Sequence, residues 1–152
     1  MTEQQLHLIV TDYLRLKHPG VIFRTDWGAG ARITPGQRVQ HKRLQQDKGY
    51  PDLFIAEPRS GFHGLFIEIK KEGTRIKRKD GEYVSNEHIR QQATTLYNLS
   101  CRGYVATFGI GFDHIVQIID EYLRLPKPNY SPPEWSIELP EPKKEVKSKE
   151  VF

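Results

Sequence analysis

The chain has 152 residues, the size of one ordinary globular domain, and 37% of them are hydrophobic, which argues against a disordered chain, a collagen-like sequence or a coiled coil. Lys and Arg number 23 against 19 Asp and Glu, and this moderate excess of +4 leaves nucleic acid open as a partner. No run of 18 apolar residues exists, and the polar N-terminus is unlike a signal peptide. We therefore expect a cytoplasmic protein (in the host cell if the protein is viral) that is not secreted and has no membrane partner.

The helix predicted near the N-terminus covers residues 3–17, with an apolar stripe that ends before Pro19-Gly20. A short strand is expected at 21–24. Residues 26–50 are rich in glycine and basic side chains and show no clean period, which is typical of a functional or mobile segment. Two strands follow, at 52–56 and 65–70.

The second half of the chain predicts a helix from an N-cap at Ser85 through Cys101, a strand at 104–108 and a helix over 112–123. We expect Cys101 to pack in the core, and a single cysteine suits a reducing compartment. The strand–helix–strand step implies a parallel pair joined by a right-handed crossover. The predicted fold class is therefore α/β, with a mixed central β-sheet flanked by helices.

The composition changes after residue 126. Six of the ten prolines lie at 126 or beyond, and residues 127–152 hold five Lys and five Glu, so the net charge belongs to residues 1–126. We expect a domain over 1–126 and a Pro/Lys/Glu-rich tail over 127–152 without a core of its own. Trp135, Ile137 and Leu139 alternate, so a short strand docking on the body or on a partner chain is a further possibility.

The strand at 65–70 combines apolar and charged residues. Because side chains alternate along a strand, Glu68 and Lys70 share one face of it. A buried charge needs a partner or a metal ion. Asp52 opens the neighbouring strand, so two carboxylates and the backbone carbonyl of Ile69 could hold Mg²⁺, with Lys70 orienting a water molecule or helping to remove its proton. This arrangement suits phosphodiester hydrolysis.

These residues resemble a known family. Gly49-Tyr50-Pro51-Asp52-Leu53, then Gly64-Leu65-Phe66-Ile67-Glu68-Ile69-Lys70, then Gln92 with Leu99 and Gly103, is similar to the PD-(D/E)XK nuclease superfamily. Within it, the chain most resembles the VRR-NUC group in its small stand-alone, bacteriophage-like form. The resemblance covers residues 3–123 and implies a restriction-endonuclease-like fold.

The resemblance also implies Mg²⁺-dependent cleavage of DNA, with Mn²⁺ able to substitute. It makes Asp52 and Glu68 metal ligands, Lys70 the catalytic lysine, Glu3 an acid near the metal and Gln92 a support of the active site. Relatives of this form resemble homodimeric, structure-selective endonucleases that act on branched DNA such as four-way (Holliday) junctions.

Each of these residues also has a simpler interpretation. Asp52 could be a turn residue after Pro51, and Glu68 with Lys70 could form an ion pair on an edge strand. Glu3 could be a favourable acid at a helix N-terminus, and Gln92 could cap a buried backbone group. The six histidines lack metal-ligand spacing and receive no catalytic role.

Two groups of basic residues are candidates for phosphate contacts. Lys70–Lys79 carries six positive charges and one negative charge. The predicted nucleic-acid-binding residues are Lys71, Arg75, Lys77, Arg78 and Lys79, together with Arg32, Arg38, Lys42 and Arg43. Tyr83 and Trp27 could stack on unpaired bases or simply pack. Gly28-Ala29-Gly30 and Gly109-Ile110-Gly111 are too short for nucleotide-binding loops and are interpreted as turns, so no nucleotide cofactor is expected.

Three functions remain open from the sequence. The leading one is a metal-dependent DNA endonuclease. The second is a non-catalytic nucleic-acid-binding module on the same fold, and the third is a sequence-specific restriction-type endonuclease that acts on duplex DNA.

Overall fold

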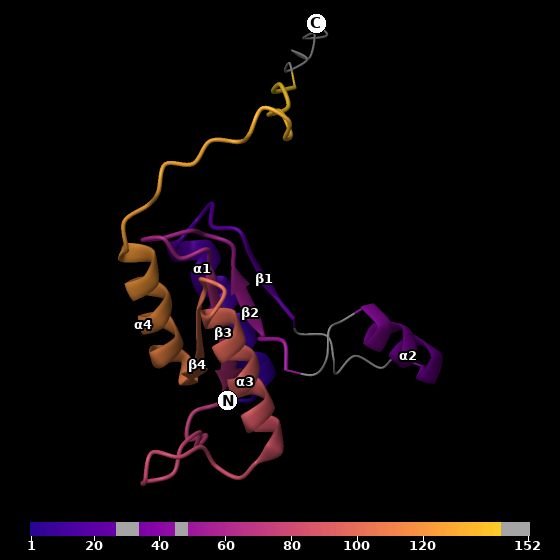
Figure 1. The fold of residues 1–152 in the computed structure, drawn as a ribbon, viewed down its shortest axis with the longest axis vertical. Coiled ribbons are helices and arrows are strands. Elements are labelled where there is room, and N and C mark those ends of the chain that lie inside the picture. The colour runs from indigo at the N-terminus through magenta and orange to yellow at the C-terminus, as the bar shows by residue number, and fades with distance from the viewer. Residues whose placement is uncertain (27–33, 45–48, 144–152) are drawn as a thin grey trace, which may run out of the picture.

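The protein is described from a computed structural model, which covers residues 1–26, 34–44 and 49–143. Its elements, in chain order, are α1 (Glu3–Lys17), β1 (Phe23–Thr25), α2 (Pro35–Leu44), β2 (Leu53–Ile55), β3 (Leu65–Lys70), α3 (Glu87–Ser100), β4 (Val105–Ile110) and α4 (Gly111–Arg124). The strands form one sheet in the order β1-β2-β3-β4 (Figure 1). The β1/β2 and β2/β3 pairs are antiparallel, and β3/β4 is parallel. The α/β class and the mixed central sheet flanked by helices are thus confirmed.

The main core lies between the sheet and the pair α1/α4. Leu6, Val10 and Leu14 of α1 give the expected helical stripe, and they meet buried residues of β2, β3 and α4. The other face of β3 carries Phe66, which stacks on Phe54 with ring centroids 4.3 Å apart. Helix α3 lies on that face, because its Gln92 hydrogen-bonds to Glu68. Strand β3 is therefore an inner strand, buried on both faces except at Lys70.

Helix α2 corrects the expectation that residues 26–50 hold no clear element. Its start has a strong local signal: the Thr34 hydroxyl accepts from the Gln37 amide at 3.2 Å, while the Gln37 side chain accepts from the Thr34 amide at 2.9 Å. Periodicity missed this helix because it has no apolar face, and none of its residues is buried. Figure 1 shows α2 standing apart from the sheet.

Three further local expectations were wrong. The N-cap of α3 is Asn86, whose side chain accepts from the Ile89 amide, and not Ser85. Gly109 and Ile110 are the end of β4 and not a turn, and α4 starts directly at Gly111. Cys101 is exposed beyond the last turn of α3 and does not pack in the core.

The described part of the tail, residues 127–143, contains no helix or strand, and it leads away from the end of α4 (Figure 1). Trp135, Ile137 and Leu139 are all more than 80% exposed, so the alternating segment does not dock on the body. The division at residue 126 stays a prediction. No described helix is both long and apolar enough to cross a bilayer.

Candidate metal and catalytic site

The register of β2 and β3 brings two carboxylates together. Leu53 pairs with Ile67, and continuing this antiparallel register by one residue places Asp52 opposite Glu68. The Ile69 amide donates a 2.9 Å hydrogen bond to Asp52 Oδ2. This bond fixes the orientation of the Asp52 carboxylate just before β2 begins. Proximity to Asp52 is also a cause of the raised pKa of Glu68.

Helix α1 adds two more groups to this point. Glu3 and His7 are one helical turn apart. One ligand atom from each of them and one from Asp52 all lie within 4.8 Å of one another. His7 Nε2 lies 3.8 Å from Asp52 Oδ2. Burial lowers the pKa of His7, although the negative charges of Asp52 and Glu3 act to raise it. The lowered pKa favours the neutral imidazole, which is the form that binds metals.

Glu68 is almost fully buried in this site. The side-chain amide of Gln92 donates to Glu68 Oε1, and Lys70 Nζ lies 3.4 Å from the same oxygen. Burial, followed by the charge of Asp52, raises the pKa of Glu68 to about 8, although Lys70 opposes the shift. Glu68 and Lys70 therefore share a face as expected, but on an inner strand and not on an edge strand.

The donor set fits a divalent cation. Glu68 Oε2 is buried and receives no hydrogen bond from a donor in the described part of the chain. The Glu68 carboxyl group lies beside the Asp52 carboxylate, and the two groups can share either a proton or a cation. Carboxylate oxygens with one imidazole are a donor set that binds divalent metals. The site is thus a possible divalent-metal centre, and the identity of the metal stays a prediction.

The candidate residues fall into two sets. Asp52, Glu68, Lys70 and Gln92 come together, with Glu3 beside Asp52. The second set comprises the exposed residues predicted to bind nucleic acid, which lie on the segment after β3 (Lys71, Arg75, Lys77, Arg78, Lys79) and on α2 (Arg38, Lys42, Arg43). Arg32 and Trp27 lie outside the described residues.

Sequence reasoning missed His7. The available signal was the spacing of Glu3 and His7, which puts both side chains on one face of a helix that also carries the buried Leu6 and Val10. It was missed because the six histidines were judged by their spacing to one another. His88 was missed for the same reason: its Nε2 lies 3.1 Å from the side-chain nitrogen of Gln92.

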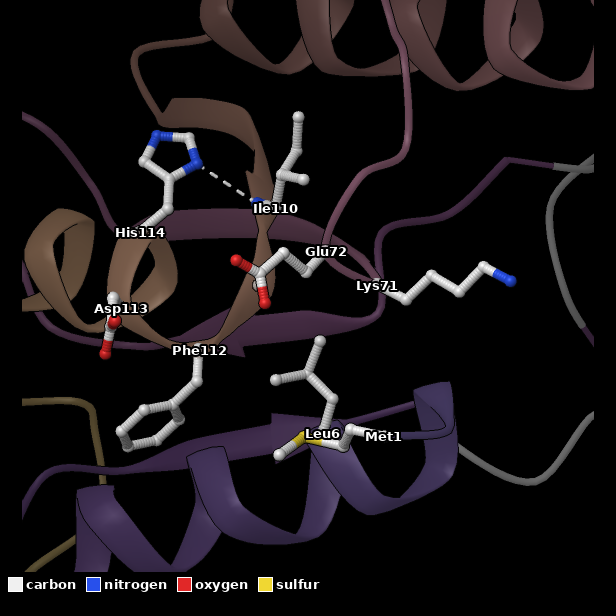
Figure 2. Close-up of a pocket in the computed structure, with 9 residues that line it drawn as sticks. Met1, Leu6, Lys71, Glu72, Ile110, Phe112, Asp113 and His114 are labelled. Carbon is white, nitrogen blue, oxygen red and sulfur yellow. Dashed lines mark hydrogen bonds between the residues drawn. The ribbon is translucent and has the colours of Figure 1, made fainter.

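A pocket of about 220 Å³ lies next to the end of β3 that carries Lys70 (Figure 2). Lys71 and Glu72 line one side, and the start of α4 lines the other with Asp113 and His114. The Ile110 amide donates to His114 Nδ1 at 3.1 Å. In Figure 2 the Lys71 side chain extends away from the pocket. Its two acidic residues make this pocket a poor place for a phosphate.

Comparisons with known proteins show a similarity of structure. No family model matches the sequence, and no curated protein matches it. A solved structure described as a VRR_NUC domain protein is similar to this chain with a TM-score of 0.59 and 24% identity, covering 84% of this chain and 92% of the other. At this level of identity the similarity establishes a shared fold.

Proposed function

We propose that the protein is a divalent-metal-dependent DNA endonuclease that hydrolyses phosphodiester bonds. The observation that carries this proposal is the convergence of two carboxylates and one ammonium group, Asp52, Glu68 and Lys70, at one point of the sheet. The similar fold of a protein described as containing a VRR_NUC domain supports it. The resemblance of the sequence to VRR-NUC nucleases points the same way.

The residues that would hold the metal are Glu3, Asp52 and Glu68, with His7 and the Ile69 carbonyl completing the donors. Mg²⁺ is the metal we propose, with Mn²⁺ able to substitute. When bound, such a cation makes an attacking water molecule more acidic and neutralises charge on the scissile phosphate.

The chain's own residues have distinct roles in this proposal. The amide of Ile69 holds Asp52 in one orientation, and Gln92 does the same for Glu68. Lys70 is largely buried, and its ammonium group can donate a hydrogen bond to the attacking water or to a phosphate oxygen. Gln92 is a positioning residue, because its described contacts are with Glu68 and His88.

Selectivity for branched DNA and a homodimeric assembly belong to this proposal and rest on the resemblance to stand-alone VRR-NUC nucleases. The basic residues after β3 and on α2 would bind phosphates, which position DNA without reading its sequence. A non-catalytic binding module and a restriction-type endonuclease remain the competing functions.

The test is a substrate panel with the purified full chain. Supercoiled plasmid, blunt duplex and a labelled four-way junction are incubated with Mg²⁺, with Mn²⁺ or with EDTA. Metal-dependent cutting that prefers the junction is expected. Binding without cutting would favour the module, and discrete plasmid fragments would favour a restriction-type enzyme. Equal cutting of duplex and junction would retain the endonuclease and reject the branch selectivity.

A further inference from the structure

A groove without acidic residues lies beside the candidate site. It consists of two hollows, of about 670 and 280 Å³, which share Tyr83. Arg75, Lys77 and His114 line the larger hollow, and Arg90 and Tyr97 line the smaller one. None of the described residues lining either hollow is Asp or Glu, although the chain contains 19 acidic residues. We call these two hollows the basic groove.

Tyr83 is held in place at the centre of the basic groove. The Val84 amide donates to the Ile76 carbonyl at 3.0 Å, and a β-bridge joins Lys77 to Tyr83. Lys77 Nζ lies 5.0 Å from the centroid of the Tyr83 ring, a cation–π contact. The ring is therefore presented by a local hairpin and remains 37% exposed.

Tyr97 lies at the far end of the groove and is 69% exposed. Arg90, Thr94 and Tyr97 recur at helical spacing on the face of α3 that is turned away from the sheet, whereas Ile89, Gln92 and Leu96 are buried. An exposed tyrosine in a hollow with an arginine and without a carboxylate offers a stacking surface beside a positive charge.

We propose that the basic groove binds single-stranded DNA, with an unpaired base stacked in the hollow of Tyr83 and Tyr97. Sites for single strands combine cations along the backbone with aromatic rings under the bases. Arg75, Lys77 and Arg90 supply the cations. The base must be unpaired, because neighbouring base pairs cover the base faces inside a duplex.

The position of the groove relates it to the candidate active site. Helix α3 carries Gln92 on one face, in contact with Glu68, and Arg90 and Tyr97 on other faces. Binding of a single strand in the basic groove does not depend on the proposed nuclease activity. The inference rests on the proposed function in one respect, namely that the bound strand belongs to the DNA that is cut.

The test measures binding in EDTA, so that cutting plays no part. Fluorescence anisotropy compares a labelled oligo-dT strand and a blunt duplex on the wild type, Tyr97→Ala, Tyr97→Phe and Tyr130→Ala. Tyr130 is a matched control, because it is 70% exposed and lies in the tail. We expect Tyr97→Ala to weaken single-strand binding about tenfold, with duplex binding unchanged. Tyr97→Phe and Tyr130→Ala should bind like the wild type.

A 2-aminopurine base in a mixed-sequence strand provides a second readout, because stacking on an aromatic ring quenches its fluorescence. The wild type should quench it, and Tyr97→Ala should not. Unchanged single-strand binding in Tyr97→Ala, an equal loss for the duplex, or no preference of the wild type for single strands would overturn the inference. If the protein never cuts DNA but still binds single strands in a way that depends on Tyr97, the proposed nuclease activity is rejected and the single-strand site in the basic groove is retained.

Discussion

Glu68 interacts with the proposed site residues Asp52, Lys70 and Gln92. Its carboxyl group is buried beside Asp52, and Lys70 and Gln92 both reach Oε1. Desolvation and the neighbouring carboxylate outweigh the lysine, so Glu68 is protonated at neutral pH in the metal-free protein, with a pKa of about 8. A group in this state can exchange its proton for a cation as the pH rises.

The pKa of Glu68 predicts how stability depends on pH. The folded protein holds this proton more tightly than the unfolded chain, whose glutamate has a pKa of 4.5. Stability is therefore lost as the pH rises between these two values, and the penalty is complete above pH 8. Glu68→Gln removes this titration, so in EDTA it should gain a few kcal/mol on the wild type between pH 5 and 8.5.

Urea denaturation of both proteins at several pH values measures this difference. A gap between Glu68→Gln and the wild type that stays constant over the whole range would show that the pKa of Glu68 is not raised.

At the scale of elements, Asp120 joins α1 to α4. The Tyr13 hydroxyl donates to Asp120 at 2.8 Å, and His18 Nε2 lies 2.9 Å from the same carboxylate. Burial would raise the pKa of Asp120, but the hydrogen bonds from His18 and Tyr13 prevail and lower it. The stability from this contact is therefore present above the usual aspartate pKa and is lost as the pH falls through the lowered value.

Asp120→Asn should accordingly destabilise the protein by about 1–2 kcal/mol at pH 7, because it replaces hydrogen bonds to a charged group. The difference should shrink toward zero as the pH falls below the lowered pKa of Asp120. Thermal or urea denaturation of both proteins at these pH values checks the prediction, and a loss independent of pH would contradict it.

Gly109 marks the close approach of β4 and α4. A Cβ atom there would lie 2.6 Å from Ile115 Cγ1 and 2.8 Å from Ile67 Cγ2, both in the buried core. Gly109→Ala should cost about 1–3 kcal/mol of unfolding free energy through overpacking. Gly36→Ala on α2 is the matched control, since no described atom outside its chain neighbours and the backbone of its own helix lies within 4 Å of its Cβ position. Equal stability of the two variants would contradict the packing at Gly109.

The elements also show what sequence can predict. The apolar stripe of α1 was predictable because one face of that helix is buried. Strand β3 was predictable because a short, mostly apolar run is typical of a buried strand. Helix α2 escaped because it buries nothing, and its signal is a polar cap. His7 escaped because its approach to Asp52 depends on how α1 packs on the sheet, which no local pattern encodes.

At the scale of the whole molecule, positively charged side chains gather on the exposed segment after β3. The segment after β3 exposes Lys77, Arg78 and Lys79, and of these Arg78 is paired with Asp80 at 3.2 Å. These residues were predictable as a basic run, but the pairing of Lys77 with Tyr83, which places Lys77 in the basic groove, was not.

Replacing Lys77, Arg78 and Lys79 together by glutamine should reduce the dependence of DNA affinity on salt. The slope of log affinity against log salt is about −0.9 per phosphate neutralised. Loss of three phosphate contacts should therefore make the slope less negative by about 2–3. Fluorescence anisotropy over a salt series measures the slope, with Lys17→Gln and Lys127→Gln as controls. An unchanged slope would show that this segment does not contact phosphates.

The initial rate of DNA cutting in Mg²⁺ tests the proposal that Asp52 and Lys70 carry out metal-dependent cleavage. Asp12→Asn and Lys127→Ala are matched controls, because both side chains are more than 70% exposed. We expect Asp52→Asn and Lys70→Ala to lower the rate at least about a hundredfold while folding and DNA binding persist, and we expect the controls to cut like the wild type. Wild-type rates in Asp52→Asn or in Lys70→Ala would contradict it.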